Sequence, residues 1–214
     1  MIHSIKSGHT NCFLLKDETT QKAVLIDAGS AADKGFIERL NVAGWTEQIG
    51  LLILTHGHFD HVGHAAMLQG HYGIKVAIHQ SDAEGVKQGR MDFSPAESLL
   101  GGIIRSASAR GMEKARYSPF TPDIIIGDEE PLPGLEMFRP VHLPGHTAGS
   151  IGVLFDGCLF AGDLVMNMPF PSPCLFADDF PMLKQSIERA KTLNPATVYP
   201  SHGMPFSGER FRRL

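Results

Sequence analysis

An apolar run that ends in a cluster of metal-ligating side chains constrains this chain more than any other feature of its sequence. The run Leu51–Leu54 is followed after one residue by four potential ligands within six positions: His56, His58, Asp60 and His61. Two histidines spaced two apart cannot share a helical face, which needs a spacing of three or four, but in extended backbone they point the same way. The pattern therefore predicts a buried strand that opens into a metal-binding loop.

The ligand types in this loop indicate which ions it would bind. Neutral imidazole and carboxylate suit Zn²⁺, with Fe or Mn as alternatives. Asp60 and His61 are adjacent and point away from the His56/His58 pair, so they offer one oxygen and one nitrogen to a second ion. The metalloprotease pattern HExxH is absent, because no Glu lies between His58 and His61. On this segment alone, a polar turn with adventitious metal affinity is the alternative interpretation.

With three further candidate ligands downstream, the sequence resembles the metallo-β-lactamase superfamily. The hallmark of that family is HxHxDH after a strand, followed far downstream by a His, an Asp and a His. Here these are His146 in LPGHTAGS, Asp163 in FAGD and His202 in YPSHG. The segments Asn11–Leu14 and Ile26–Gly29 also resemble the opening strands of the family. The resemblance covers nearly the whole chain.

This resemblance implies a fold, a metal site and a reaction. The fold would be a four-layer αββα sandwich of two mixed β-sheets. Two Zn²⁺ ions would share a hydroxide that attacks a carbonyl carbon, while Asp60 orients the nucleophile or passes on a proton. By position in the family pattern, the first ion would be held by His56, His58 and His146, the second by Asp60, His61 and His202, and both by Asp163.

Hydrophobic periodicity independently predicts an α/β fold. Helical spacing occurs in Asp33–Val42, in Pro181–Leu193 with Asp179 as N-cap, and near His64–Leu68. A single domain over residues 1–214 is expected, with a helical lid inserted at about 91–120. The predicted strands are Asn11–Leu15, Ala23–Asp27, Ile49–Leu54, Lys75–Ile78, Asp123–Ile126, Glu136–Val141, Ile151–Phe155, Cys158–Ala161 and Thr197–Tyr199.

The net charge and the cysteine content limit which binding partners and which cellular compartment we expect. The net charge of −4 offers no broad attraction for nucleic acid. Three widely spaced cysteines do not suit a disulfide framework, which favours a cytoplasmic location. No leader peptide and no membrane span are expected. The apolar, Pro-rich loop Met166–Phe176 is expected to line the pocket of a small-molecule substrate, to form a contact within a homodimer, or to pack on the core as an ordinary loop.

Two departures from the family pattern qualify the resemblance. His64 stands where a small residue is common, and it is expected to face solvent or bond a neighbour rather than to support a ligand. Only twelve residues follow His202, so no C-terminal helical domain for glutathione binding is expected.

The leading function is hydrolysis of a small ester, thioester or lactone, as in the hydroxyacylglutathione hydrolase branch that the chain resembles. The alternative is a mono-iron oxidoreductase that resembles persulfide dioxygenases. A non-catalytic metal-binding module is a third class, which the complete ligand set disfavours. A flavodiiron reductase would want a Glu in place of His58, and a nuclease would want a positive surface.

Overall fold

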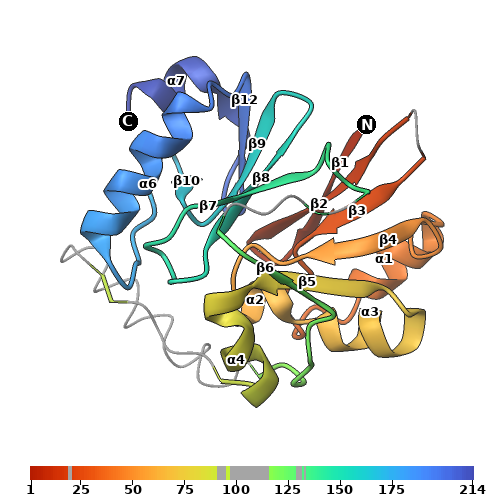
Figure 1. The fold of residues 1–214 in the computed structure, drawn as a ribbon. Helices are drawn as coiled ribbons and strands as arrows, with labels where there is room; N and C mark the ends of the chain where they lie inside the picture. Colours follow the sequence, from red (N-terminus) through yellow and green to blue (C-terminus); the bar gives the residue numbers. More distant parts are fainter. Residues whose placement is uncertain (19–20, 91–94, 97–115, 129–131, 133) are drawn as a thin grey trace. The chain divides into compact units, whose positions relative to one another are not determined.

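The computed structural model describes residues 1–18, 21–90, 95–96, 116–128, 132 and 134–214, and it forms two compact units (Figure 1). Unit 1 comprises Met1–Met91 and Ala115–Ile126, and unit 2 comprises Asp92–Lys114 and Gly127–Leu214. Each unit has its own β-sheet and its own hydrophobic core, so the predicted α/β class is confirmed. The lid predicted at about 91–120 lies largely outside the described residues.

Unit 1 contains a six-stranded mixed sheet in the order β1-β2-β3-β4-β5-β6. The first three strands pair antiparallel, whereas β3 to β6 run parallel and are joined by helical connections. The predicted metal-binding motif therefore follows a central parallel strand, β4, at its carboxyl end. The strands are β1 (Ile2–Ser7), β2 (Thr10–Lys16), β3 (Ala23–Ile26), β4 (Ile49–Ile53), β5 (Lys75–His79) and β6 (Ile124–Ile126).

The helices of unit 1 pack against one face of this sheet (Figure 1). Leu40, Leu68 and Val86 come from three different helices, and all belong to one buried cluster with Leu25 and Leu52 from the strands. Burial of this apolar area supplies the main stabilising free energy of the unit. The helices are α1 (Phe36–Val42), α2 (Phe59–Val62), α3 (Ala65–Tyr72) and α4 (Gln80–Gln88).

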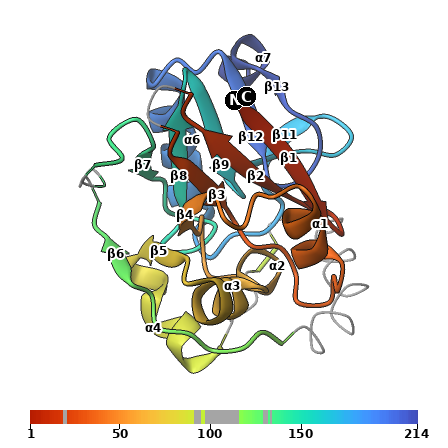
Figure 2. The ribbon, with the colours of Figure 1, turned by 90° about the vertical axis from the view of Figure 1, so that its right-hand side faces the viewer.

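Unit 2 contains a five-stranded mixed sheet in the order β13-β12-β9-β8-β7, in which only the β12–β9 pair is parallel. A separate hairpin, β10 (Val165–Asn167) with β11 (Pro171–Pro173), follows β9 directly. Figure 2 shows β13 beside the C-terminal helix α7 (Gly208–Arg212). The sheet strands are β7 (Arg139–His142), β8 (Ile151–Phe155), β9 (Cys158–Gly162), β12 (Thr197–Pro200) and β13 (Phe206–Ser207).

Helix α6 (Phe180–Thr192) covers the sheet of unit 2 and confirms the helix expected there. The Asp179 carboxylate accepts a hydrogen bond of 2.8 Å from the Met182 amide, which caps the first turn as predicted. Leu183 and Ile187 lie one turn apart and pack into the core of the unit. This helix spans the connection between the hairpin and β12, so it positions both.

Each predicted strand is present, but seven of the described elements were not predicted and one strand begins later than expected. The strand predicted at Glu136–Val141 begins only at Arg139, and the missed elements are β1, α2, α4, β10, β11, β13 and α7. Strand β1 is at the edge of its sheet and alternates polar with apolar residues, and α4 is rich in polar residues, so neither has a strong apolar signature.

In the described part of the chain, no helix combines the length and apolar character that crossing a bilayer requires.

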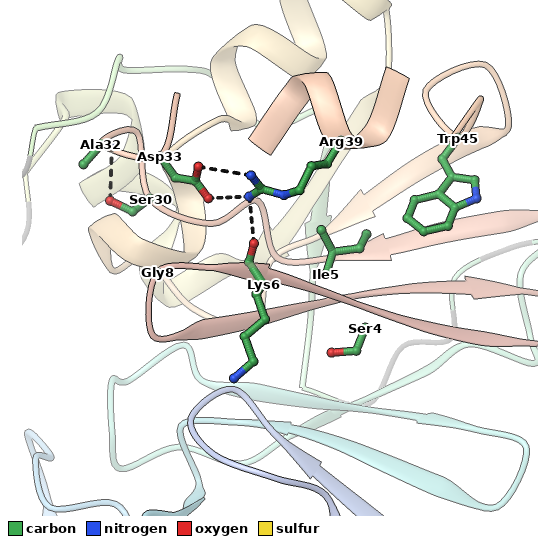
Figure 3. Close-up of a pocket in the computed structure, with 9 residues that line it drawn as sticks. All are labelled: Ser4, Ile5, Lys6, Gly8, Ser30, Ala32, Asp33, Arg39 and Trp45. Carbon is green, nitrogen blue, oxygen red and sulfur yellow. Dashed lines mark hydrogen bonds and ion pairs between the residues drawn. The ribbon is translucent and has the colours of Figure 1, made fainter. Parts of the chain in front are cut away.

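A groove of about 810 Å³ lies in unit 1 beside the edge strand β1 (Figure 3). The Arg39 guanidinium donates to the Asp33 carboxylate and to the Lys6 carbonyl, so its charge is compensated within the protein. No predicted metal ligand is among the described residues that line it, which are Ser4, Ile5, Lys6, Gly8, Ser30, Ala32, Asp33, Arg39 and Trp45.

Candidate metal centre

The four ligands predicted in unit 1 gather around the end of β4 and form what we call the first ligand set: His56, His58, Asp60 and His61. Helix α2 starts immediately after His58, so Asp60 and His61 lie on its single turn. The ring centroid of His56 is 4.6 Å from that of His58 and 4.0 Å from that of His61. Asp60 Oδ2 lies 3.7 Å from His61 Nε2. The strand-to-loop transition thus brings the four side chains together, while their role as ligands stays a prediction.

A buried carboxylate, Asp27, orients two of these imidazoles. Its Oδ2 accepts a hydrogen bond of 2.8 Å from His61 Nδ1, and its Oδ1 accepts one of 2.8 Å from the Thr55 amide. The Thr55 hydroxyl donates to the same carboxylate at 2.9 Å and lies 3.1 Å from His56 Nδ1. Because both Nδ1 atoms are engaged in this way, Nε2 is the nitrogen that carries the lone pair in the neutral rings of His56 and His61. Sequence reasoning missed Thr55, and it noted Asp27 only as part of an opening strand.

The backbone around this set is tied together at two glycines. The Ala28 amide donates to the His61 carbonyl at 2.6 Å, and the Gly63 amide donates to the Gly29 carbonyl at 2.7 Å. A Cβ atom on Gly63 would lie 2.2 Å from the Ala31 amide nitrogen, so this contact requires glycine. The loop after β3 and the ligand-bearing turn therefore form one hydrogen-bonded frame.

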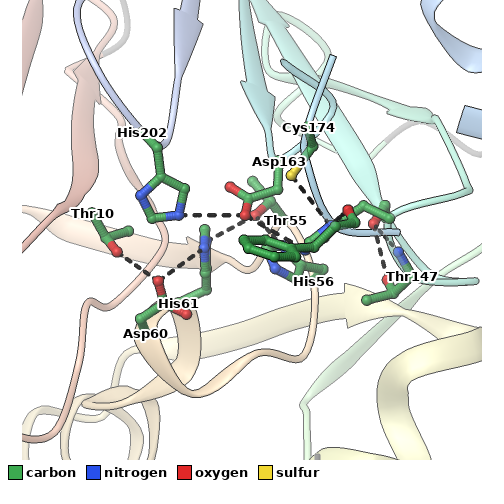
Figure 4. Close-up of polar contacts among 12 residues, drawn as sticks. Thr10, Thr55, His56, Asp60, His61, Thr147, Asp163, Cys174 and His202 are labelled. Carbon is green, nitrogen blue, oxygen red and sulfur yellow. Dashed lines mark hydrogen bonds and ion pairs between the residues drawn. The ribbon is translucent and has the colours of Figure 1, made fainter. Parts of the chain in front are cut away.

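The three ligands predicted in unit 2 form what we call the second ligand set: His146, Asp163 and His202. Asp163 Oδ2 lies 3.5 Å from His146 Nε2 and 3.3 Å from His202 Nε2 (Figure 4 labels Asp163 and His202). Asp163 and His202 approach each other because each follows one of the parallel strands β9 and β12, whose carboxyl ends meet at the same edge of the sheet. One carboxylate oxygen is therefore flanked by two imidazole nitrogens.

The orientation of His146 is fixed largely by the backbone. Its Nδ1–H donates to the Phe176 carbonyl at 2.7 Å, and a carbonyl can only accept, so Nε2 carries the lone pair. The preceding Gly145 adopts a φ of 132°, and a Cβ there would lie 2.3 Å from the Leu183 amide nitrogen. The sulfur of Cys174 lies 3.6 Å from His146 Nδ1, a neighbour that sequence reasoning did not predict. The backbone thus turns one ring nitrogen of His146 towards Asp163.

The donor types of both sets, and the spacing within the second set, fit a divalent cation. Zn–N and Zn–O bonds of about 2.0–2.1 Å at a tetrahedral angle separate two ligand atoms by about 3.4 Å. The Asp163–His146 and Asp163–His202 separations of 3.5 and 3.3 Å match that spacing. Imidazole and carboxylate are also the donors that Zn²⁺, Fe and Mn share, so the spacing and the chemistry agree on a metal site without selecting the metal.

Two other titratable side chains near the first ligand set, Cys12 and His64, pack as structural residues. Burial, with the negative charge of Asp27 adding to it, raises the pKa of the Cys12 thiol well above its ordinary value, so the sulfur stays protonated. His64 stacks on Phe36 with ring centroids 5.1 Å apart, and its Nε2 lies 3.1 Å from the Asp33 carbonyl. His64 therefore bonds a neighbour, one of the two arrangements expected for it, and burial lowers its pKa.

Comparison with known proteins places all seven predicted ligands inside one family match. The model of the metallo-β-lactamase superfamily matches residues 6–202. The probable metallo-hydrolase YflN of Bacillus subtilis is 31% identical over 216 residues, which cover 88% of this chain and 78% of the relative. The hydroxyacylglutathione hydrolase GloC of Haemophilus influenzae is 30% identical over 162 residues, which cover 73% of this chain and 67% of the relative.

Solved structures resemble the chain over its whole length. The B3 metallo-β-lactamase BLEG-1 superposes with a TM-score of 0.77 at 22% identity, covering 100% of this chain and 97% of the other. TTHA1623, solved in a di-iron-bound form, superposes with a TM-score of 0.70 at 24% identity, again covering 100% and 97%. Likeness at these identities shows the fold alone: two mixed β-sheets flanked by helices, as the sequence predicted.

Proposed function

Since the chain belongs to the metallo-β-lactamase superfamily, we propose that it is a binuclear metallo-hydrolase that cleaves a small ester, thioester or lactone. The observation that carries this proposal is the position of Asp163 Oδ2 between the Nε2 atoms of His146 and His202, at ligand spacing from both. A carboxylate flanked in this way suits a bridge between ions. The family match spans both ligand sets, which supports the proposal that they serve one centre.

The seven candidate ligands divide between two ions in this proposal, and Asp163 is common to both. When bound, two Zn²⁺ ions would supply a hydroxide near neutral pH and stabilise the charge that develops on the substrate carbonyl. The first ion would be held by His56, His58 and His146, the second by Asp60, His61 and His202, and both by Asp163.

The residues around the ligands hold them ready for this chemistry. Asp27 keeps His61 in the tautomer whose Nε2 is unprotonated, and Thr55 does the same for His56. The Phe176 carbonyl performs this task for His146. Asp60 orients the nucleophile or passes on a proton, because a positioned carboxylate can accept one.

The substrate class is proposed from chemistry and from relatives. Carboxylic esters, thioesters and lactones share an electrophilic carbonyl whose tetrahedral intermediate carries a negative charge that cations stabilise. Two relatives are hydroxyacylglutathione hydrolases, from Haemophilus influenzae and, at 25% identity over 205 residues, from Bdellovibrio bacteriovorus. Their substrates are thioesters, so we place thioesters first in the class and assign no particular thiol.

A second candidate, a mono-iron oxidoreductase similar to persulfide dioxygenases, is favoured by one feature of the second ligand set. His146, Asp163 and His202 together are two histidines and one carboxylate, the ligand combination of many non-haem iron oxygenases. One iron per chain, with oxygen consumed during turnover, would support this candidate over the hydrolase.

Metal quantification on purified protein, followed by a panel of thioesters, esters, lactones, phosphodiesters and β-lactams, tests the proposal. We expect two ions per chain and hydrolysis of the carbonyl substrates. Asp60→Ala and His58→Ala should lose turnover with the fold retained, whereas His71→Ala, an exposed histidine of α3, should behave as wild type. Full activity in Asp60→Ala or His58→Ala would overturn the catalytic assignment.

A further inference from the structure

We propose that Thr10 is a positioning residue that holds the Asp60 carboxylate ready for the second ion, an inference that rests on the proposed function. The Thr10 hydroxyl donates a hydrogen bond of 2.8 Å to Asp60 Oδ2 (Figure 4). Thr10 is only 1% exposed, although it is fifty residues before Asp60 in the sequence. Hydrogen bonds to a charged carboxylate are stronger than those between neutral groups, so this contact restricts the carboxylate to one orientation.

The β1–β2 hairpin fixes the place of Thr10. Thr10 pairs with Ser7 across a two-residue turn, in which Gly8 adopts a φ of 62°. The Ser7 hydroxyl accepts a hydrogen bond of 3.0 Å from the Ser30 amide. A Cβ on Gly29 would lie 2.4 Å from that hydroxyl, so the hairpin packs closely against the loop that carries Gly29. This is the same loop that is bonded to the ligand-bearing turn, and Thr10 therefore reaches Asp60 from a rigid frame.

The kind of donor matters as much as its position. A lysine or arginine at this point would orient the carboxylate, but it would also place a positive charge beside a cation site. A hydroxyl orients the carboxylate without repelling a cation. Asp60 Oδ2 lies 3.7 Å from His61 Nε2, and the Asp60 side chain is 22% exposed. A carboxylate oxygen has two lone-pair directions, so Oδ2 can accept the Thr10 hydrogen bond and still face a cation.

A clear effect on metal binding follows. Because Asp60 belongs to the second ion in the proposed function, removal of the hydroxyl should weaken binding of the second metal equivalent about 10- to 100-fold, the usual effect of losing a group that orients a ligand. The first equivalent should be unchanged, and kcat should fall with the second.

Zn²⁺ titration of metal-free protein by calorimetry, with a thermal unfolding scan of each variant, tests this inference. Thr10→Val removes the hydroxyl at nearly constant volume and should weaken the second equivalent alone. Thr10→Ser keeps the hydroxyl and should bind both equivalents as wild type does. Thr46→Val is the matched control, since the Thr46 hydroxyl donates to Asn41 at 2.9 Å in the same unit. If Thr10→Val unfolds, Thr10→Ala gives the same measurement with a smaller side chain.

A double-mutant cycle identifies the residue through which Thr10 acts. In an Asp60→Ala background, Thr10→Val should have no further effect on metal affinity. Additive losses would overturn the inference, as would a Thr10→Val protein that binds both equivalents like wild type. In either case wild type and Asp60→Ala would still behave as the proposed function requires. A wild-type chain that binds a single ion would instead contradict the proposed function itself, and this inference with it.

Discussion

The first and second ligand sets use the same donor chemistry, but they are built in different ways. The first set comes from one short segment, and buried side chains orient it: Asp27 and Thr55 fix two imidazoles, and Thr10 holds a carboxylate. The second set comes from three separated loops, and the backbone orients it through the Phe176 carbonyl and through the turn at Gly145.

This difference indicates where each set is sensitive. A set oriented by side chains loses its geometry when a supporting hydrogen-bonding group is replaced, even if the ligands stay. A set oriented by the backbone tolerates such changes but depends on main-chain conformations that only certain residues can adopt. The following experiments test this contrast in order of decreasing expected effect.

Substitution of the carboxylate shared within the second set should have the largest effect. Asp163→Asn keeps the size of the side chain but removes the charge that lies 3.3 and 3.5 Å from two imidazole nitrogens. We expect both metal content and kcat/KM to fall, the latter by on the order of 1,000-fold, or about 4 kcal/mol. Asp156→Asn, at a turn of the same unit, is the control. Wild-type activity in Asp163→Asn would remove the carboxylate from the centre.

Replacement of the glycine before His146 should come next. In Gly145→Ala the new Cβ would lie 2.3 Å from the Leu183 amide nitrogen at a φ of 132°, so strain and overlap should cost about 3 kcal/mol. Gly157→Ala has a φ of 70° with no atom within 4 Å of the new Cβ, so it should lose only about 1 kcal/mol. Urea denaturation measures both free energies of unfolding. Equal losses would show that backbone packing does not hold the second set.

The side-chain support of the first set is tested by Asp27→Asn. Asparagine tolerates the φ of 60° found at this position, but it lacks the charge that holds His61 Nδ1–H. Metal affinity should fall about 10- to 100-fold, or roughly 1.4 to 2.7 kcal/mol. Competition with a chromophoric chelator measures the affinity. Asp123→Asn changes a carboxylate that bonds the Val76 amide and should leave metal affinity intact. If the two variants bind metal alike, the first set does not depend on Asp27.

We expect the smallest effect from His64, which contributes to the pH dependence of the free energy of unfolding. Burial lowers its pKa from the usual 6.5, so the folded protein takes up this proton less readily than the unfolded chain. The stability it contributes is complete above pH 6.5 and declines as the pH falls below that value. His64→Asn should flatten this part of the stability curve of metal-free protein, measured by urea denaturation between pH 5 and 8. An unchanged pH dependence would contradict the assignment.

The sequence predicted most of the strands and the main helices because these elements carry strong local signals. Helix α6 has an N-cap at Asp179 and an apolar stripe, and β8 spans the same residues as predicted. Elements without such signals were missed. Among the strands that the structure describes, β1 pairs only with β2, and its sequence is half polar. Its pairing with β2 depends on a turn at Gly8 rather than on hydrophobic pattern.

The candidate ligands could be named from the sequence, but most of the groups that orient them could not. His56 and His58 stand out because two histidines spaced two apart after an apolar run point the same way in extended backbone. Thr10 and Thr55 are common residues in common surroundings, and no local pattern distinguishes a threonine that bonds a ligand from one that does not. Cys174 lies twenty-eight residues from the histidine it contacts.

The order and types of the candidate ligands, and the family they indicate, were therefore determined by the sequence alone, because the kind of donor atom is a property of each residue. The tertiary structure alone decided which ring nitrogen of His56, His61 and His146 is hydrogen-bonded, and which hydroxyl holds Asp60. The physical reason is that such bonds require donor and acceptor within about 3 Å at a suitable angle. Residues distant in the chain meet that condition only once strands, turns and loops have packed.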